Sequence, residues 1–444
     1  MKASTFKGGI HPEYNKQRSE KEAIRPLLAP SEIVIPLSQH IGAPATAAVN
    51  VGDDVLAGQV IGSAGGFVSV PVHSSVSGKV LAIEPRPSAT GPSVQSVIIE
   101  NDGEYKEADF LGLGDDWENT DISLLRDKIK DAGIVGMGGA TFPTHVKLSP
   151  PKDKPIDTVI LNGAECEPYL TADHRVMLER SEDVITGLRI AMKILGAAQG
   201  FVGIEVNKQD AIKVMEKAVN GTKIKVVPLQ IKYPQGAEKQ LIDACIGRQV
   251  PSGKLPMDVG AVVQNVGTSA AIADAVLRGR PLIERVVTVT GAAVGKPSNL
   301  LAKVGTPVSY AIEACEGDLE KTGKLILGGP MMGFAQHFAT PPIIKGTSGI
   351  LLLTKDEIST QDPYPCIRCG RCLTVCPMHL VPAEIAVYSS KGMLEEVENF
   401  DALDCVECGS CAHECPSGIP LVQLIRLGKA AINAAKRREK GGQS

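Results

Sequence analysis

The pattern of hydrophobic and polar positions divides the chain into segments of different character. Residues 31–104 contain short runs of apolar and β-branched residues separated by turn residues, as in VNVGDDVLAGQVIG and VSVPVHSSVSGKVLAIE. Such runs predict short strands that are joined by tight turns. This part of the chain is therefore expected to form an all-β domain.

The central part of the chain shows a different alternation. Apolar runs such as DTVILN, GFVGIEV and GAVVQNV alternate with amphipathic helical patterns between residues 105 and 285. This alternation predicts an α/β domain. Residues 286–335 then show two strand patterns, in RVVTVTGAAV and after it, followed by a helical pattern. The predicted fold class is thus α/β multidomain.

Composition and charge narrow the function classes. The 444 residues carry a net charge of −4, which argues against nucleic-acid binding as the main activity. No apolar run reaches the roughly 18 residues of a membrane span, and the first residues lack the apolar segment of a signal peptide. We therefore expect a reducing compartment, where cysteines are metal ligands more often than disulfides.

Eight of the eleven cysteines lie in two copies of one motif. CIRCGRCLTVCP (366–377) and CVECGSCAHECP (405–416) both follow the pattern C-x2-C-x2-C-x3-C-P. In two-cluster ferredoxins the fourth cysteine of each run ligates the other [4Fe–4S] cluster. A pair of zinc sites is the alternative, but zinc sites more often use two C-x2-C hairpins. We assign Cys366, Cys369, Cys372 and Cys415 to the first cluster, and Cys405, Cys408, Cys411 and Cys376 to the second.

Three glycine-rich polar stretches lie upstream, at residues 133–147, 158–175 and 233–242. The first, GIVGMGGATFPTHVK, lets backbone N–H groups approach a phosphate, and Lys147 adds a positive charge. It lacks the G-x-G-x-x-G spacing of dinucleotide-binding loops, so a plain turn remains an alternative. Clusters carry one electron, whereas a nicotinamide carries a hydride, and a flavin converts between the two. The sequence therefore suggests an NADH–flavin–cluster relay.

At this point the chain resembles known proteins. GMGGATFPTHVKL is similar to the glycine loop GRGGAGFPTGLKW of the 51-kDa NADH-binding subunit of respiratory complex I. TFKGGIHPEYNK and IPLSQHIGAP, together with the twin cysteine runs, resemble the RnfC family over residues 6 to about 427. The resemblance implies a peripheral subunit of a membrane-bound, ion-translocating ferredoxin:NAD+ oxidoreductase. It further implies non-covalent FMN, NAD(H) and two [4Fe–4S] clusters as cofactors.

The same resemblance implies the surroundings of the protein. The expected partners are the membrane subunits of the complex and an iron–sulfur subunit that accepts electrons from ferredoxin. The expected location is the cytoplasmic face of the cell membrane. With this family in view, the predicted domains are an N-terminal arm (1–30), a barrel-sandwich hybrid (31–104), an FMN- and NADH-binding α/β domain (105–285), a β-grasp domain (286–335), a linker (336–360), a two-cluster ferredoxin-like domain (361–427) and a basic tail (428–444).

Individual residues match the functional positions of the family. The positions that correspond to FMN contacts are Gly136, Gly138, Lys147, Asn162, Glu165, Glu167, Tyr233, Gly236, Glu238, Asn265 and Thr268. Phe142 matches an aromatic residue that stacks on the dinucleotide. Glu167 and Glu238 are expected to place negative charge near the nicotinamide, which favours its oxidised, cationic form.

The chain departs from the family pattern at three positions. Met137 stands where the related glycine loop has arginine, so one cationic contact is missing. Leu148 and Pro150 replace aromatic residues after Lys147, which weakens the expected stacking surface for the adenine of NADH.

Two alternative functions follow from the same features. One is a soluble flavin–iron–sulfur reductase, such as an NADH-dependent cobalamin reductase. The other is an electron-transfer adaptor that docks ferredoxin and binds no nucleotide.

Overall fold

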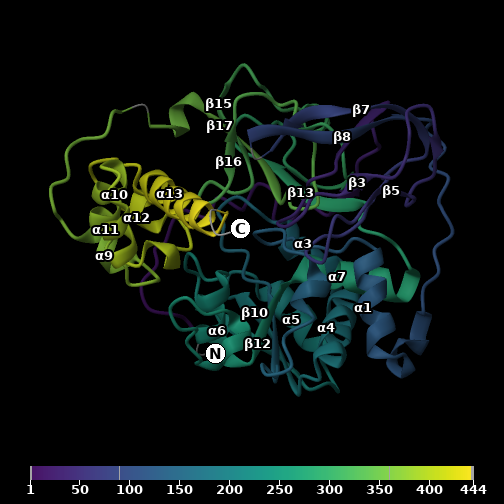
Figure 1. Ribbon diagram of the computed structural model, residues 1–444, viewed down its shortest axis with the longest axis horizontal. Helices are drawn as coiled ribbons and strands as arrows, with labels where there is room; N and C mark the ends of the chain where they lie inside the picture. The colour runs from purple at the N-terminus through teal and green to yellow at the C-terminus, as the bar shows by residue number, and fades with distance from the viewer. Residues whose placement is uncertain (1–2, 90, 360, 442–444) are drawn as a thin grey trace.

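The computed structural model describes residues 3–89, 91–359 and 361–441. The ends of the predicted N-terminal arm, linker and basic tail, at residues 1–2, 360 and 442–444, lie outside the described residues, as does residue 90. Figure 1 shows a helical C-terminal module on the left, a helix-covered sheet below, and two β-rich modules above and to the right.

The first β module consists of two small antiparallel sheets. One has the order β2 (Glu32–Pro36), β8 (Gly91–Asn101), β7 (Gly78–Ser88) and β4 (Asp54–Val55); the other has β3 (Thr46–Ala47), β5 (Val60–Ser63) and β6 (Val72–His73). Alternate residues of the strands face inward, so Ile33, Ile35, Val97 and Ile99 are fully buried. The strand pattern of the sequence therefore corresponds to a two-sheet sandwich.

The central domain is built on a four-stranded parallel sheet. Its order is β11 (Ile224–Leu229), β10 (Gln199–Glu205), β9 (Thr158–Asn162) and β12 (Ala261–Asn265). The associated helices are α1 (Ile122–Asp131), α2 (Thr144–Lys147), α3 (Ala172–Glu179), α4 (Ser181–Leu195), α5 (Gln209–Ala218), α6 (Glu238–Ile246) and α7 (Val266–Ala273). The carboxyl ends of parallel strands lie at one edge of the sheet, and the loops at this edge hold the residues considered below.

A six-stranded mixed sheet forms the second β module. Its order is β1 (Ile24–Pro26), β14 (Ser298–Lys303), β13 (Glu284–Thr290), β17 (Gly349–Thr354), β15 (Thr322–Leu327) and β16 (Phe334–Gln336), with α8 (Val308–Glu313) beside it. The sequence placed β1 in the N-terminal arm and β17 in the linker. In the structure, β1 pairs with β14 at the edge of this sheet, and the apolar run of β17 is buried between β13 and β15.

The C-terminal module is helical. It contains α9 (Arg371–Val375), α10 (Pro382–Ser390), α11 (Leu394–Asn399), α12 (Ser410–His413) and α13 (Leu421–Gly441). Helix α13 crosses the boundary at residue 428 that the sequence suggested between the cluster domain and a tail. It does so because Ile432, beyond that boundary, packs with Ile385, Val397 and Ile425 in the core of the module.

The N-terminal arm ties the modules together. The N–H of Ser4 donates to the carbonyl of Pro228 (2.9 Å) and that of Ile10 to the carbonyl of Tyr233 (2.8 Å), both in the central domain. Between them, the N–H of Gly9 donates to the carbonyl of Val375 in α9 (2.9 Å). The arm therefore joins the central domain to the cysteine-rich module.

Candidate functional site

Two asparagines mark the edge of the parallel sheet where the candidate residues gather. Asn162 and Asn265 are the last residues of β9 and β12 and are aligned in register. The Asn265 Oδ1 accepts the N–H groups of Gly267 (2.8 Å) and Thr268 (3.2 Å), which caps the first turn of α7. The Asn162 side chain donates to the carbonyl of Gly236 (2.9 Å). Both side chains thereby fix loops at the carboxyl edge of the sheet.

The glycine loop lies against this edge. Its Met137 N–H donates to the Thr268 hydroxyl (2.9 Å), and its Gly136 N–H donates to the carbonyl of Phe142 (2.9 Å). A methyl group on Gly138 would lie 2.9 Å from the Asn265 side chain, so a larger residue would not fit. Gly138 and Gly139 are exposed, and their N–H groups make no hydrogen bond within the part of the chain that is described. This bare loop with free donors fits the phosphate end of a flavin mononucleotide.

Lys147 and Glu238 form an ion pair across the site. The Nζ of Lys147 in α2 lies 2.7 Å from the Oε1 of Glu238, the first residue of α6. Both side chains remain about one third exposed. The structure therefore brings together Gly136, Gly138, Asn265 and Thr268 on one side, and Lys147, Asn162, Gly236 and Glu238 on the other.

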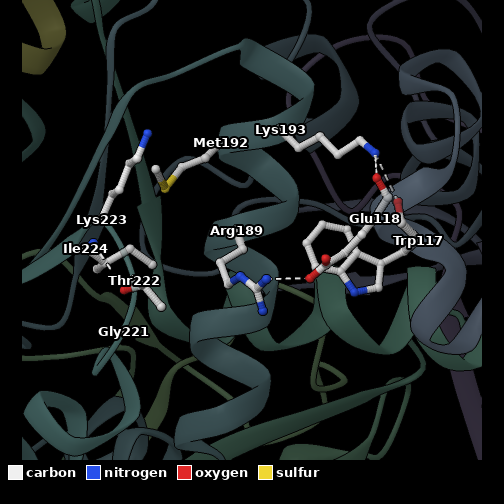
Figure 2. Close-up of a pocket in the computed structure, with 9 residues that line it drawn as sticks. All are labelled: Trp117, Glu118, Arg189, Met192, Lys193, Gly221, Thr222, Lys223 and Ile224. Carbon is white, nitrogen blue, oxygen red and sulfur yellow. Dashed lines mark hydrogen bonds and ion pairs between the residues drawn. The ribbon is translucent and has the colours of Figure 1, made fainter.

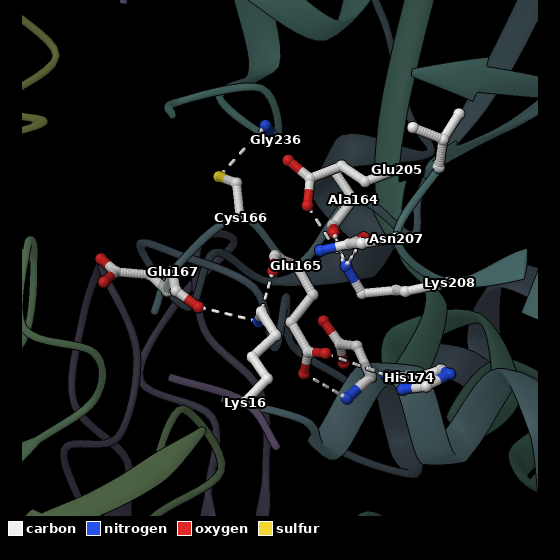
Figure 3. Close-up of polar contacts among 12 residues, drawn as sticks. Lys16, Ala164, Glu165, Cys166, Glu167, His174, Glu205, Asn207, Lys208 and Gly236 are labelled. Carbon is white, nitrogen blue, oxygen red and sulfur yellow. Dashed lines mark hydrogen bonds and ion pairs between the residues drawn. The ribbon is translucent and has the colours of Figure 1, made fainter. Parts of the chain in front are cut away.

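The side chains of Glu165 and Glu167 point in different directions (Figure 3). The Glu165 carboxylate accepts the N–H groups of Asp173 (2.6 Å) and His174 (3.2 Å) at the start of α3. The Glu167 carboxylate accepts the N–H groups of Met331 (3.1 Å) and Met332 (2.9 Å), between β15 and β16 of the second β module. Burial raises the pKa of Glu167 to about 7. In this structure the two acids thus hold neighbouring backbone segments.

Two buried lysines brace the loop that carries these acids. Lys16, from the N-terminal arm, donates to the carbonyls of Glu165 (2.8 Å), Glu167 (2.9 Å) and Leu170. Burial lowers the pKa of Lys16 to about 8. Lys208 donates to the carbonyl of Ala164 (2.7 Å), as Figure 3 shows. The sequence analysis assigned no role to either lysine, because nothing in TFKGGIHPEYNK, which Lys16 ends, or in the start of α5, which Lys208 precedes, indicates which distant carbonyls they contact.

Cys166 lies in the same loop and is buried. Its sulfur accepts the N–H of Gly236 (3.3 Å), and burial raises the pKa of the thiol to about 12. A thiol that stays protonated is a poor nucleophile, so Cys166 fills space and holds the Gly236 loop.

The second cysteine set lines one pocket in the C-terminal module. Cys376, Cys405, Cys408 and Cys411 surround this pocket together with apolar side chains such as Val422. Backbone N–H groups approach two of the sulfurs: that of Leu380 lies 3.4 Å from Cys376, and that of Glu407 lies 3.4 Å from Cys405. Four thiols around a pocket with amide donors fit a [4Fe–4S] cluster.

The first cysteine set is more open to solvent. Cys366 and Cys369 are exposed, whereas Cys372 and Cys415 are partly buried against one apolar cluster. The segment before Cys366 meets the segment after Cys415, because the N–H of Tyr364 donates to the carbonyl of Ser417 (2.9 Å). This crossing supports the assignment of Cys415 to the first set.

No three His, Cys, Asp or Glu side chains of the described chain are placed to hold a metal ion. In a four-iron cluster each thiolate ligates a different iron atom, so the sulfurs stand farther apart than around a single ion.

Tyr233 connects the central domain with the second cysteine set. Its hydroxyl donates to the carbonyl of Cys408 (2.7 Å), and burial raises the pKa of Tyr233, which keeps it a neutral donor. Nearby, the Gln240 side chain donates to the carbonyl of Pro377 (3.1 Å). Tyr233, Cys166 and Cys408 also share one buried cluster. The second set therefore lies against the central domain.

A further pocket, shown in Figure 2, lies at the opposite edge of the sheet, near the first residue of β11. It is lined by Trp117, Glu118, Arg189, Met192, Lys193, Gly221, Thr222, Lys223 and Ile224. Arg189 pairs with Glu118, and Lys193 donates to the carbonyls of Trp117 and Glu118. Ligands of parallel sheets bind at the carboxyl edge, so this pocket is not the candidate site.

Four family models match the chain. They are the RnfC barrel-sandwich hybrid domain (residues 4–104), the Nuo51 FMN-binding domain (129–274), the SLBB domain (286–335) and the 4Fe-4S dicluster domain (365–419). Among the described residues, every helix is too short or too polar to traverse a lipid bilayer.

Curated relatives match over nearly the whole chain. The C subunit of the Na(+)-translocating ferredoxin:NAD(+) oxidoreductase complex of Acetobacterium woodii is 50% identical over 99% of both chains. The C subunit of the proton-translocating complex of Clostridium ljungdahlii is 50% identical over 98% of this chain and 96% of its own. A solved NAD+-reducing [NiFe]-hydrogenase is 17% identical, with a TM-score of 0.49, over 76% of this chain and 73% of its own. The chain therefore belongs to the RnfC family, the C subunits of ion-translocating ferredoxin:NAD+ oxidoreductase complexes.

Proposed function

We propose that this protein is the subunit in which NAD(H) exchanges a hydride with FMN and single electrons pass through two [4Fe–4S] clusters. The complex around it would be a membrane-bound, ion-translocating ferredoxin:NAD+ oxidoreductase, as the names of the relatives state for those proteins. The observation that carries the proposal is the hydrogen bond from Tyr233 to Cys408, which joins the flavin domain directly to a cluster loop.

The residues that would hold the cofactors follow from the site. The glycine loop with Asn265 and Thr268 would hold the FMN phosphate, and Lys147, Asn162 and Glu238 would border the rest of the flavin. Phe142 remains the candidate for contact with NADH. When bound, the flavin converts between a two-electron hydride and single electrons, which the clusters carry. Because this is the chemistry of the cofactors, the protein supplies position and charge.

The different burial of the two cysteine sets suggests the order in which electrons pass between the clusters. Cys376, Cys408 and Cys411 are 7% exposed, and Cys408 packs with Cys166 and Tyr233 of the flavin domain, whereas Cys366 and Cys369 are exposed. The second set would therefore stand on the flavin side of the relay, and the first set on the partner side. The partner would be the iron–sulfur subunit that accepts electrons from ferredoxin, with the membrane subunits beyond it, at the cytoplasmic face of the membrane.

An anaerobic NADH titration of FMN-supplemented protein, followed by visible absorbance, tests the proposal. Bleaching of both flavin and cluster bands supports the relay. Flavin bleaching alone would separate the clusters from the flavin and contradict it. Bleaching by reduced ferredoxin but not by NADH would instead favour the adaptor that binds no nucleotide.

The soluble cobalamin reductase remains the alternative enzyme, although the full-length relatives do not favour it. Purification from membranes distinguishes the two. Retention with membrane subunits supports the complex, whereas recovery as a free protein that reduces a corrin would overturn it.

A further inference from the structure

Arg285 is a buried cation at the boundary between the six-stranded sheet and the glycine loop. It is the second residue of β13 and only 4% of it is exposed. Its Nε donates to the carbonyl of Thr347 (2.9 Å), and its Nη2 donates to the carbonyl of Met137 in the glycine loop (2.8 Å). The six-stranded sheet therefore holds a guanidinium against the backbone of the loop.

This cation has no ion-pair partner among the residues that the structure describes. Within residues 3–89, 91–359 and 361–441, no carboxylate lies within 4.0 Å of Arg285. Asp173 and Glu165 act on it only from a longer distance, and its Nη1 makes no hydrogen bond in the same ranges. Burial of a charge without a carboxylate in direct contact is costly, because the two carbonyls replace only part of the hydration that the guanidinium loses. An anion bound at the loop would add a counter-charge in direct contact with the guanidinium.

The position of the guanidinium matches the missing contact in the loop. A methyl group placed on Gly267, in the first turn of α7, would lie 3.4 Å from Nη1 of Arg285 and 3.5 Å from Cε of Met137. The side chains of Arg285 and Met137 therefore both lie against Gly267. Met137 stands where the similar loop of the 51-kDa subunit has arginine, and Arg285 brings a cation from another part of the chain to the backbone of this position.

We propose that Arg285 pairs with the phosphate of the flavin mononucleotide and replaces the cation that the glycine loop lacks. The inference rests on the proposed function, because it takes FMN as the ligand. It adds that the flavin site is completed by the six-stranded sheet, since β13 lies outside the segment matched by the FMN-binding domain model. The free N–H groups of Gly138 and Gly139 would contact the same phosphate.

Comparison of FMN with riboflavin tests this role, because the two ligands differ only by the phosphate. Dissociation constants would be measured by quenching of flavin fluorescence on the full-length protein depleted of flavin. The wild type is expected to bind FMN more tightly than riboflavin. Arg285→Gln should weaken FMN binding by about tenfold to a hundredfold and leave riboflavin binding unchanged. Arg285→Lys, which keeps the charge, should retain part of the preference for FMN.

Arg25→Gln is the matched control. Arg25, on β1 of the same sheet, also donates to a backbone carbonyl, that of Ala314 (2.9 Å), but lies outside the candidate site. Arg25→Gln should leave the affinities for FMN and for riboflavin unchanged. Equal weakening of FMN and riboflavin by Arg285→Gln, or no change in either, would overturn the role of Arg285. Failure of the wild type to bind either flavin would instead contradict the proposed function itself.

Discussion

At the scale of single residues, four charged side chains that are buried or partly buried have backbone groups as hydrogen-bond partners. Lys16 and Arg285 both donate to carbonyls, and Glu165 and Glu167 accept from backbone N–H groups. Such contacts replace part of the hydration that each charge loses on burial. The loops of the site are therefore held by charged side chains that reach in from other segments.

Glu167→Gln is expected to change how stability depends on pH. Because burial raises the folded pKa of Glu167 to about 7, the wild type loses stability as the pH rises from the unfolded pKa through 7. Glutamine does not titrate, but its single side-chain oxygen can accept only one of the two N–H groups that Glu167 holds. The variant should therefore be less stable than the wild type near pH 5 and recover about 1–3 kcal/mol relative to it between pH 5 and pH 8, visible in the midpoints of thermal unfolding.

Glu32→Gln, which alters an exposed acid on β2, serves as the control and should follow the wild type at both pH values. Parallel curves for Glu167→Gln and the wild type would show that the buried carboxylate does not titrate as expected. On the proposed function, Glu167→Gln should also change the rate of NADH oxidation while the iron content stays the same.

At the scale of elements, the sequence pattern of the N-terminal arm does not indicate that the arm contacts two other modules. Gly8 and Gly9 both have positive φ, and the arm passes between the flavin domain and the cluster loop at this point. A methyl group on Gly8 would lie 2.8 Å from the carbonyl oxygen of Cys376. The arm therefore requires glycine here both for its backbone conformation and for its close approach to a cluster ligand.

Gly8→Ala is expected to lower stability and to loosen the second cluster. Gly52 provides the matched control, since its φ of +95° resembles the +85° of Gly8 but nothing lies within 4 Å of an added methyl group. Both variants should carry the cost of a positive φ, about 1–2 kcal/mol. Only Gly8→Ala should also lose iron, as measured by iron content after gel filtration. Equal iron content in the two variants would argue against this contact.

At the scale of the whole molecule, the site is assembled from segments far apart in the sequence. The N-terminal arm supplies Lys16, the parallel sheet supplies Asn162 and Asn265, and the six-stranded sheet supplies Arg285. The cysteine-rich module then meets this assembly through Tyr233. A relay requires such contacts, because a cluster can exchange electrons with a flavin only if the two lie close together.

Cysteine variants test the crossed assignment of the two runs. Cys376→Ser should remove the cluster that lies against the flavin domain, although Cys376 belongs to the first run. The iron content should fall by about half, and the electron paramagnetic resonance signal that remains should match that of Cys408→Ser. Cys245→Ser, outside both runs, should keep both clusters. If the spectrum of Cys376→Ser matched that of Cys369→Ser instead, it would contradict the assignment.

Much of the architecture could be read from local patterns. The strand runs of the sandwich, the alternation of the α/β domain and the cysteine spacing are repeated over short distances, so the sequence shows them directly. The segments 24–26 and 349–354 were harder to place, because a single short strand does not reveal which sheet it joins. The same limit applies to α13, whose continuation past residue 428 depends on the packing of Ile432.

The sequence by itself determined the family and the cofactor classes, and it proposed the cysteines that would serve as ligands, because these depend on residue types at fixed spacing. Only the tertiary structure decided which groups surround the flavin loops. Lys16 and Arg285 lie 149 and 148 residues from the loop residues Glu165 and Met137 that they contact, and no local pattern links positions so distant. Both cations lose water when the chain folds. The backbone carbonyls of the loops replace part of this hydration, and this stabilises the cations at these positions.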